Sequence, residues 1–273
     1  MIGKDVRLKQ LFKHSRKLFI LPMDHGITIG PVQGLNNISQ LINHVKGDID
    51  AIVVHKGMVS QVQPNLGPGA CDLIIHLSAS TTLAPNVDSK RLVTSVEHAI
   101  RLGATAVSVH VNLGSEEEVD MLEDMGMVSE ACELWGMPLL AMMYVRDGIK
   151  ENEYDLKKLK HAVRVAEELG ADIVKINYSG NSNTFREVVN SVKIPVIIAG
   201  GPRMSSDLEL LKTVHDAVGA GAMGVAFGRN VFQHPNPAPL AYAIRQILDS
   251  KVSEEDLILL AEGCKIEDNF EVE

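Results

Sequence analysis

The chain has 273 residues, 45% of them hydrophobic and 22% charged, a composition typical of a globular protein that buries a sizeable core. Its net charge of −9 disfavours a nucleic-acid or anionic-membrane partner, although a local basic pocket for one phosphate remains compatible with it. Three widely spaced cysteines without a CxxC motif indicate neither a disulfide framework nor a zinc site, and no apolar run resembles a signal peptide or a membrane span. We therefore expect a cytoplasmic protein.

Eight apolar runs of strand length recur along the chain. They are continuous rather than alternating, which is typical of parallel strands buried on both faces. The runs occupy residues 18–26, 51–57, 73–79, 106–112, 138–145, 173–179, 195–201 and 224–230.

Helical patterns with recognisable start and stop residues lie between most of these runs. Segments 155–169 and 207–218 each carry an apolar face and are followed by Gly170 and Gly219. A hydroxyl residue with a carboxylate three positions later predicts a capped helix start at three places. These pairs are Thr94 with Glu97, Ser115 with Glu118, and Ser206 with Glu209.

Eight strand–helix units in one chain of this length predict an α/β fold, a (β/α)₈ TIM barrel. We expect a single domain over residues 1–273, with residues 1–15 as a loose N-terminal extension and a C-terminal helical tail after about residue 250. A doubly wound open sheet is the alternative, but such a sheet usually has a glycine-rich turn after its first strand. Here the first strand ends in PMDHG.

Polar residues or glycines stand at the ends of all the predicted strands, where catalytic groups of a TIM barrel lie. They are Asp24, His25, His55, Lys56, His76, Ser78, His110, Asn112, Tyr144, Arg146, Lys175, Tyr178, Gly200, Gly201, Gly228 and Arg229. In the last two loops, AGGP and FGRN, small residues expose backbone N–H groups beside Arg229, which favours a phosphate site over mere tight turns. His25, His55, His76 and His110 raise a zinc hypothesis, but HxH or HxxE spacings are absent, so we expect most of them to be hydrogen-bonded core residues.

Lys175 lies within an apolar strand, GADIVKINYSGN. The strand period of two places Ile173, Lys175 and Asn177 on one face and Val174, Ile176 and Tyr178 on the other. If the first face points into the barrel, burial favours the neutral amine, which attacks a ketone to form an iminium. Asp24 and Tyr144 are candidate proton carriers for that chemistry, whereas an ion-paired structural lysine is the alternative.

The motifs PMDHG, HKG, AMMY, ADIVK, AGGP and GRN, in this order, resemble those of the archaeal-type class I, Schiff-base aldolases, over about residues 17 to 235. Within that family the likeness is to 2-amino-3,7-dideoxy-D-threo-hept-6-ulosonate synthases and their relatives, the class I fructose-bisphosphate aldolases. The resemblance implies a TIM barrel without metal or cofactor, a homo-oligomer, often a decamer, and a phosphorylated ketose donor. The donor fragment would be transferred to L-aspartate semialdehyde on a route to aromatic precursors, while a related branch joins dihydroxyacetone phosphate to that acceptor.

By this resemblance Lys175 is the nucleophile, Asp24 the proton acceptor and Tyr144 the proton donor. Gly200, Gly201, Gly228 and Arg229 match the phosphate loops, and His25 and Arg146 are further candidates for binding the substrate. Asn177 and Asn181 depart from the family pattern and bear on the choice of acceptor. A thiolase-like acyl transferase, a metal-dependent barrel enzyme and a non-catalytic phosphate-binding barrel remain as alternatives.

Overall fold

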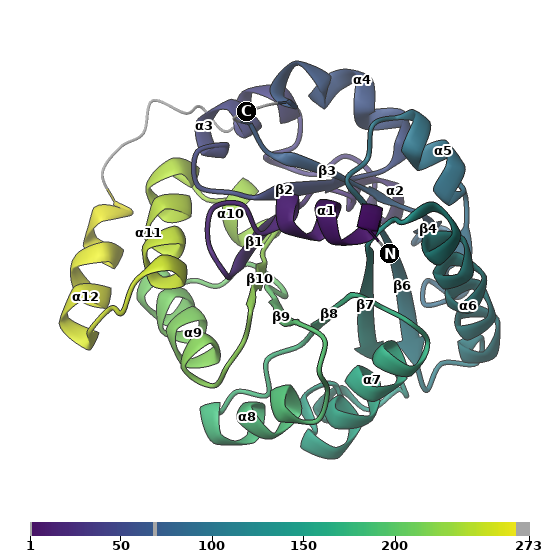
Figure 1. Cartoon of the computed structure of the whole chain (residues 1–273). Coiled ribbons are helices and arrows are strands. Elements are labelled where there is room, and N and C mark those ends of the chain that lie inside the picture. Colours follow the sequence, from purple (N-terminus) through teal and green to yellow (C-terminus); the bar gives the residue numbers. More distant parts are fainter. Residues whose placement is uncertain (1, 68–69, 266–273) are drawn as a thin grey trace.

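The computed structural model of the chain describes residues 2–67 and 70–265 and shows a closed barrel of eight parallel strands (Figure 1). The strands follow one another around the barrel in the order β1, β10, β9, β8, β7, β6, β3, β2. Their bounds are β1 Leu18–Pro22, β2 Ala51–Val54, β3 Asp72–His76, β6 Ala106–Leu113, β7 Leu139–Val145, β8 Ile173–Ile176, β9 Val196–Ala199 and β10 Gly224–Ala226. The predicted TIM barrel and all eight predicted strands are confirmed.

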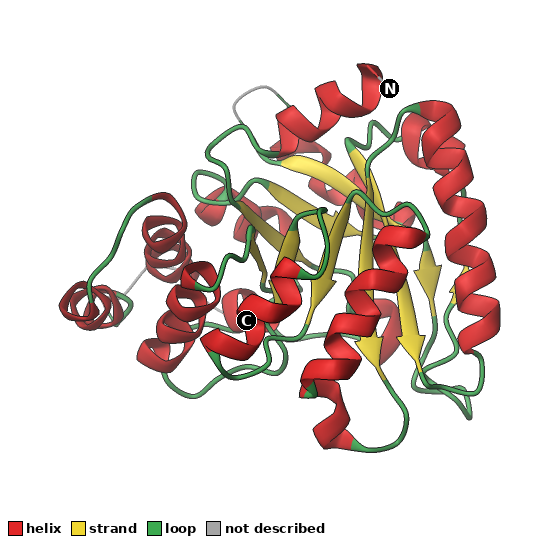
Figure 2. Cartoon of the chain, turned by 60° about the horizontal axis from the view of Figure 1, so that its bottom comes forward, coloured by secondary structure: helices red, strands yellow, loops and turns green. Residues whose placement is uncertain are grey.

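Helices surround the barrel on its outside (Figure 2). Their bounds are α2 Gly26–Ile29, α3 Ile38–Val45, α4 Val59–Val62, α5 Val96–Arg101, α6 Glu118–Trp135, α7 Leu156–Glu168, α8 Ser182–Asn190, α9 Asp207–Gly219, α10 Arg229–Phe232 and α11 Pro237–Asp249. The predicted C-terminal helix is α12, Glu254–Gly263, and the end of the tail from residue 266 lies outside the described residues. No helix in the described ranges is long and apolar enough to cross a membrane.

The core has two layers because alternate strand residues face opposite sides. Ile173 belongs to the cluster inside the barrel, together with Leu18 and Ile20. Val174 and Ile176 belong to the larger cluster between the barrel and its helices. The predicted alternation on β8 is therefore confirmed, and it directs Lys175 inward.

The expectation that residues 1–15 are a loose extension is wrong. Residues Ile2–Leu11 form helix α1, which lies across one end of the barrel (Figure 1). Leu11 is fully buried and joins the inner cluster with Leu18 and Val53. The charged, weakly amphipathic sequence of this helix concealed its role, because only its last turn enters the core.

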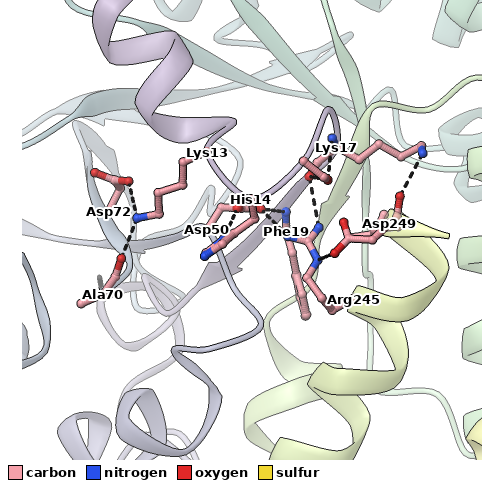
Figure 3. Close-up of polar contacts among 11 residues, drawn as sticks. Lys13, His14, Lys17, Phe19, Asp50, Ala70, Asp72, Arg245 and Asp249 are labelled. Atoms are coloured by element: carbon pink, nitrogen blue, oxygen red, sulfur yellow. Dashed lines mark hydrogen bonds and ion pairs between the residues drawn. The ribbon is translucent and has the colours of Figure 1, made fainter. Parts of the chain in front are cut away.

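Buried carboxylates fix this N-terminal segment to the N-terminal ends of the barrel strands (Figure 3). The fully buried Asp50 accepts hydrogen bonds from Phe19 N at 2.7 Å and Arg245 Nη1 at 3.0 Å, and it pairs with His14 Nδ1 at 2.7 Å. Asp72 pairs with Lys13 Nζ at 3.0 Å. Each carboxylate thus joins segments that are distant in sequence.

Two of the three predicted helix starts need correction. Helix α5 is capped by Ser95 rather than Thr94, since the Ser95 side chain accepts from His98 N. Ser115 does not cap α6; its hydroxyl donates to Asn112 O. Ser206 caps α9 as predicted, accepting from Glu209 N. Local capping patterns do not foresee competing partners such as Asn112 O.

Two insertions extend the barrel at the C-terminal ends of its strands. Between β3 and α5, strands β4 Ser78–Ala79 and β5 Arg91–Leu92 form a small antiparallel ladder. Between β7 and α7, the chain forms the 3₁₀ helix η3, Lys150–Tyr154. Shorter 3₁₀ turns, η1 Lys56–Met58 and η2 Gln63–Asn65, flank α4. The β3 and β7 insertions supply walls for the cavity described next.

Candidate active site

A cavity of about 390 Å³ opens at the C-terminal ends of the strands, opposite helix α1. This is the end of a TIM barrel at which catalytic residues lie. Most of the predicted strand-end residues line it: Asp24, His25, His55, His76, Ser78, His110, Asn112, Tyr144, Arg146, Lys175, Gly200, Gly201, Gly228 and Arg229. Every residue proposed from sequence as catalytic or substrate-binding is therefore brought into one cavity.

Lys175 points into this cavity from β8 and is 7% exposed. Its Nζ lies 3.9 Å from Met142 Sδ and 6.0 Å from the centre of the Tyr144 ring. Within the described part of the chain it forms no ion pair, so the structural alternative of a lysine tied to a carboxylate does not apply to these residues. The amine is buried among weakly polar neighbours, with reach to a substrate in the cavity.

Asp24 follows β1 and lies between two imidazoles. Its Oδ1 is 3.6 Å from His25 Nδ1, and its Oδ2 is 3.8 Å from His76 Nε2. Burial acts to raise the pKa of Asp24, but His76, His25 and the Lys175 ammonium outweigh it and hold that pKa well below its usual range. Burial lowers the pKa of His76 to about 3. Asp24 is therefore ionised and His76 neutral at neutral pH, so the carboxylate is available to accept a proton.

Tyr144 lies on β7, beside the lysine strand. Its ring packs against His110, with ring centres 4.7 Å apart, and the Arg146 guanidinium lies 5.2 Å from its centre. Arg146 forms an ion pair with Glu153 of η3. The insertion after β7 thus braces the side of the cavity that holds the phenol.

The two glycine loops approach each other closely after β9 and β10. Asn230 joins them: its Nδ2 donates to Gly200 O at 2.7 Å, and its Oδ1 accepts from Met204 N at 2.7 Å. A Cβ on Gly228 would lie 2.6 Å from Pro22 O, so only glycine fits there. Arg229 Nε is buried and finds no hydrogen-bond partner among the described residues. An unpaired guanidinium beside glycine-rich turns is suited to binding an anion.

The expectation of hydrogen-bonded core histidines is met in part: two of the four are hydrogen-bonded, but all four line the cavity. His76 Nδ1 contacts Ser108 Oγ at 2.7 Å, and His110 Nε2 contacts Asn112 Oδ1 at 2.8 Å. The Nδ1 atoms of His25 and His55 are buried without a partner in the described ranges. Within residues 2–67 and 70–265, no three His, Cys, Asp or Glu side chains are grouped as a metal site requires.

Three singled-out residues lie outside the cavity. Lys56 donates to Val93 O and lines a neighbouring apolar cavity next to α2, which shares Asp24 and His55 with the first. Tyr178 is on the outward face of its strand, where its ring packs against Phe185 of α8. Asn181 caps α8 by accepting from the backbone N–H groups of Asn183 and Thr184. By contrast, Asn177 lines the cavity and its Nδ2 donates to Glu153 O at 3.4 Å.

Sequence reasoning missed the polar residues that the two insertions bring to the cavity. Asp88 and Lys90 come from the β4–β5 segment, and Lys150 and Glu153 come from η3. Lys90 is only 8% exposed, and its Nζ donates to Ser80 Oγ at 2.5 Å. The available indication was the unusual length of the β3–α5 connection, since long ordered loops in a compact domain are often functional.

The model of the DeoC/LacD family aldolases matches residues 18–234. The chain is 46% identical over 258 residues to 2-amino-3,7-dideoxy-D-threo-hept-6-ulosonate synthase 1 of Archaeoglobus fulgidus, covering 94% of this chain and 95% of that protein. It is 44% identical over 248 residues to 2-amino-4,5-dihydroxy-6-oxo-7-(phosphonooxy)heptanoate synthase of Streptomyces griseus, covering 90% of each. The chain belongs to the DeoC/LacD aldolase family and is an enzyme of the class I, Schiff-base type.

Solved structures agree with this assignment. An archaeal fructose 1,6-bisphosphate aldolase superposes with a TM-score of 0.80 at 31% identity, over 90% of this chain and 98% of that one. A second archaeal aldolase structure, at 30% identity and the same TM-score, covers 90% of this chain and 99% of that one and has its catalytic lysine bound covalently to a carbinolamine intermediate. The expected family resemblance is confirmed.

Proposed function

We propose that this protein is an aldol-forming synthase that joins a phosphorylated ketose fragment to an amino-acid aldehyde, L-aspartate semialdehyde, through an iminium on Lys175. The observation that carries the proposal is the inward-facing, unpaired Lys175 in a cavity that Asp24, Tyr144 and the two glycine loops also line. Two relatives with 44–46% identity over at least 90% of the chain support it, since the names of both describe seven-carbon 2-amino acids.

In the proposed reaction, Lys175 Nζ attacks the ketone carbon of the donor and water leaves, giving the iminium. The iminium then draws electrons from a bond at the neighbouring carbon, so that an enamine forms: a C–H bond gives up its proton to Asp24, or a C–C bond of a longer donor breaks and the remainder leaves as an aldehyde, its hydroxyl proton passing to Asp24. The enamine carbon attacks the acceptor aldehyde, whose oxygen takes up a proton as the new C–C bond forms. Water finally hydrolyses the iminium and releases the product from Lys175.

Asp24 and Tyr144 carry the protons of these steps. Asp24 is ionised, and it lies among imidazoles that are held neutral, so it accepts a proton from the donor carbon or hydroxyl. Tyr144, on the strand next to that of Lys175, donates a proton to the developing hydroxyl. Gly200, Gly201, Gly228 and Arg229 hold the donor phosphate, which fixes the ketone carbon near Lys175.

The donor itself is a phosphoketose: dihydroxyacetone phosphate, fructose 1,6-bisphosphate or a deoxy-ketohexose phosphate. The Streptomyces relative's name describes a chain with a 6-oxo group and a 7-phosphate, as addition of dihydroxyacetone phosphate to a four-carbon amino-acid aldehyde would give. The homo-oligomer implied by the family resemblance stays a prediction, which native mass spectrometry tests by counting copies.

The test is a product assay read by mass spectrometry. Each donor is incubated with and without L-aspartate semialdehyde, using wild type, Lys175→Met and, as a matched control, Lys56→Met, which replaces a lysine outside the cavity. We expect a seven-carbon amino-acid product from wild type and Lys56→Met, and none above background from Lys175→Met. Cleavage of fructose 1,6-bisphosphate without transfer to the amino-acid aldehyde would contradict the synthase and leave a simple aldolase.

A further inference from the structure

The cavity contains a second buried amine that the iminium chemistry does not use. Lys90 is 8% exposed and lines the cavity, and its Nζ donates one hydrogen bond, to Ser80 Oγ. It forms no ion pair within the described ranges, although an ammonium has three donors. Burying an ammonium with so little compensation is costly, so a ligand that supplies negative charge would relieve the cost.

Lys90 lies across the cavity from the two glycine loops that hold the donor phosphate in the proposed reaction. Lys90 directly precedes β5 in the insertion that follows β3, whereas the loops follow β9 and β10. In the strand order of the barrel, β3 and β9 are four strands apart in either direction, hence opposite. Lys175 belongs to β8, beside β9. A substrate bound at the loops and reacting at Lys175 therefore directs its other end towards Lys90.

This end of the cavity carries both signs of charge. Asp88 lines the cavity two residues before Lys90, and Glu153 is paired with Arg146 nearby. The opposite end instead offers the unpaired Arg229 and backbone N–H groups. Mixed charge suits a group with a carboxylate and an ammonium, while purely cationic surroundings suit a phosphate.

We infer that Lys90 binds the anionic group at the far end of the acceptor aldehyde and thereby sets acceptor preference. The inference rests on the proposed function, because the acceptor is defined by that reaction. The anion is a carboxylate or a phosphate; the Asp88 and Glu153 carboxylates favour the carboxylate of an amino-acid aldehyde. Lys90 acts here as a specificity residue and does not take part in the covalent steps.

The experiment compares three acceptors at saturating dihydroxyacetone phosphate. L-Aspartate semialdehyde carries a carboxylate, D-glyceraldehyde 3-phosphate a phosphate, and D-glyceraldehyde no charge. The variants are Lys90→Met, Lys90→Arg and the control Lys56→Met, with kcat/KM measured for each acceptor. In parallel, borohydride trapping of dihydroxyacetone phosphate on Lys175 reports whether the donor step operates.

Lys90→Met should lower kcat/KM for the charged acceptors by about tenfold or more relative to D-glyceraldehyde, mainly through KM, the size expected for one charge-assisted hydrogen bond. Lys90→Arg should restore part of this preference, and Lys56→Met should keep all of it. Loss confined to one charged acceptor identifies which anion Lys90 binds. Equal effects on charged and neutral acceptors, with trapping intact, overturn the inference alone; absence of trapping in wild type overturns the proposed function as well.

Discussion

Asp24 and His76 lie side by side and are both deprotonated at neutral pH, so that one is charged and the other is neutral. Burial works against charge on both groups, but the basic side chains of His76, His25 and Lys175 around Asp24 outweigh it there, whereas for His76 burial prevails. The result is an ionised carboxylate next to a neutral imidazole. A base so arranged accepts a proton without first losing one, which is what the abstraction step requires.

Strand alternation made much of the site predictable at the level of single residues. The period of two directed Lys175 and Asn177 inward and Tyr178 outward, and the structure agrees on all three. Lys90 and Glu153 could not be found in this way, because they belong to insertions whose path depends on tertiary packing. That all four histidines meet at one cavity could not be predicted for a related reason: spacing along one strand says nothing of convergence between strands.

At Asn181 the departure from the family pattern has a structural explanation. Its side chain accepts hydrogen bonds from Asn183 N at 2.8 Å and Thr184 N at 3.3 Å and so begins α8. We expect Asn181→Ala to lower the free energy of unfolding by roughly 1 kcal/mol, the usual cost of losing a cap, without altering the product profile. Urea denaturation measures it, with the exposed Asn190→Ala at the other end of α8 as control. A changed product profile in Asn181→Ala would instead place this residue in substrate selection.

Among the elements, helix α1 shows how a polar sequence can become part of a core. Lys4 pairs with Asp172 at 3.2 Å, and Gln10 and Lys13 donate to Asp72. These carboxylates lie at or just before the starts of β8 and β3, so the helix is held against the strand N-termini. Composition could not predict this, because the partners are more than fifty residues away. The strands themselves were predictable since each is buried on both faces.

Leu11 makes the apolar contribution of this helix, and it is fully buried among barrel residues. We expect Leu11→Ala to lower the free energy of unfolding by about 2–5 kcal/mol, since it removes buried methyl groups and leaves a cavity. The control is Val6→Ala, at a position 58% exposed on the same helix, which should change stability by less than about 0.5 kcal/mol. Equal effects of the two variants in urea denaturation would show that α1 is dispensable to the core.

On the scale of the whole molecule, the two ends of the barrel have different tasks. The end at the N-termini of the strands carries carboxylates whose hydrogen bonds are satisfied, such as Asp50, which has three hydrogen-bonded or ionic partners. The end at the C-termini of the strands holds Arg229, His25 and His55, each with a buried nitrogen atom that lacks a partner among the described residues. Buried polar groups without partners cost stability, and they indicate that a ligand binds at this end. The repeated strand–helix units made the barrel predictable, while this division emerges only once all eight strands are assembled.

The buried imidazoles also make stability depend on pH. Burial lowers the pKa of His25, His55 and His110 and brings that of His76 to about 3, whereas an unfolded histidine titrates near 6.5. The unfolded chain therefore binds more protons below pH 6.5, and stability falls as pH decreases through that range. For His76 alone the loss by pH 5 is about 2 kcal/mol.

Urea denaturation at pH 7.5 and pH 5.0 measures this dependence. Burial raises the pKa of Asp48 and Asp172, which acts in the opposite sense as they take up protons, so the comparison uses single-histidine variants. His76→Gln should reduce the loss between the two pH values, and the exposed His161→Gln should leave it unchanged. An identical pH dependence in wild type and His76→Gln would contradict the assignment of a neutral, buried His76.

The central claim is that Lys175 forms the iminium, and borohydride reduction tests it most directly. Folded protein is treated with dihydroxyacetone phosphate and borohydride, then analysed by intact mass and peptide mapping. We predict one reduced adduct, on the peptide containing Lys175, which is absent without borohydride and absent from Lys175→Met. An adduct on Lys90 or any other lysine, or no adduct with any phosphoketose, would contradict the account.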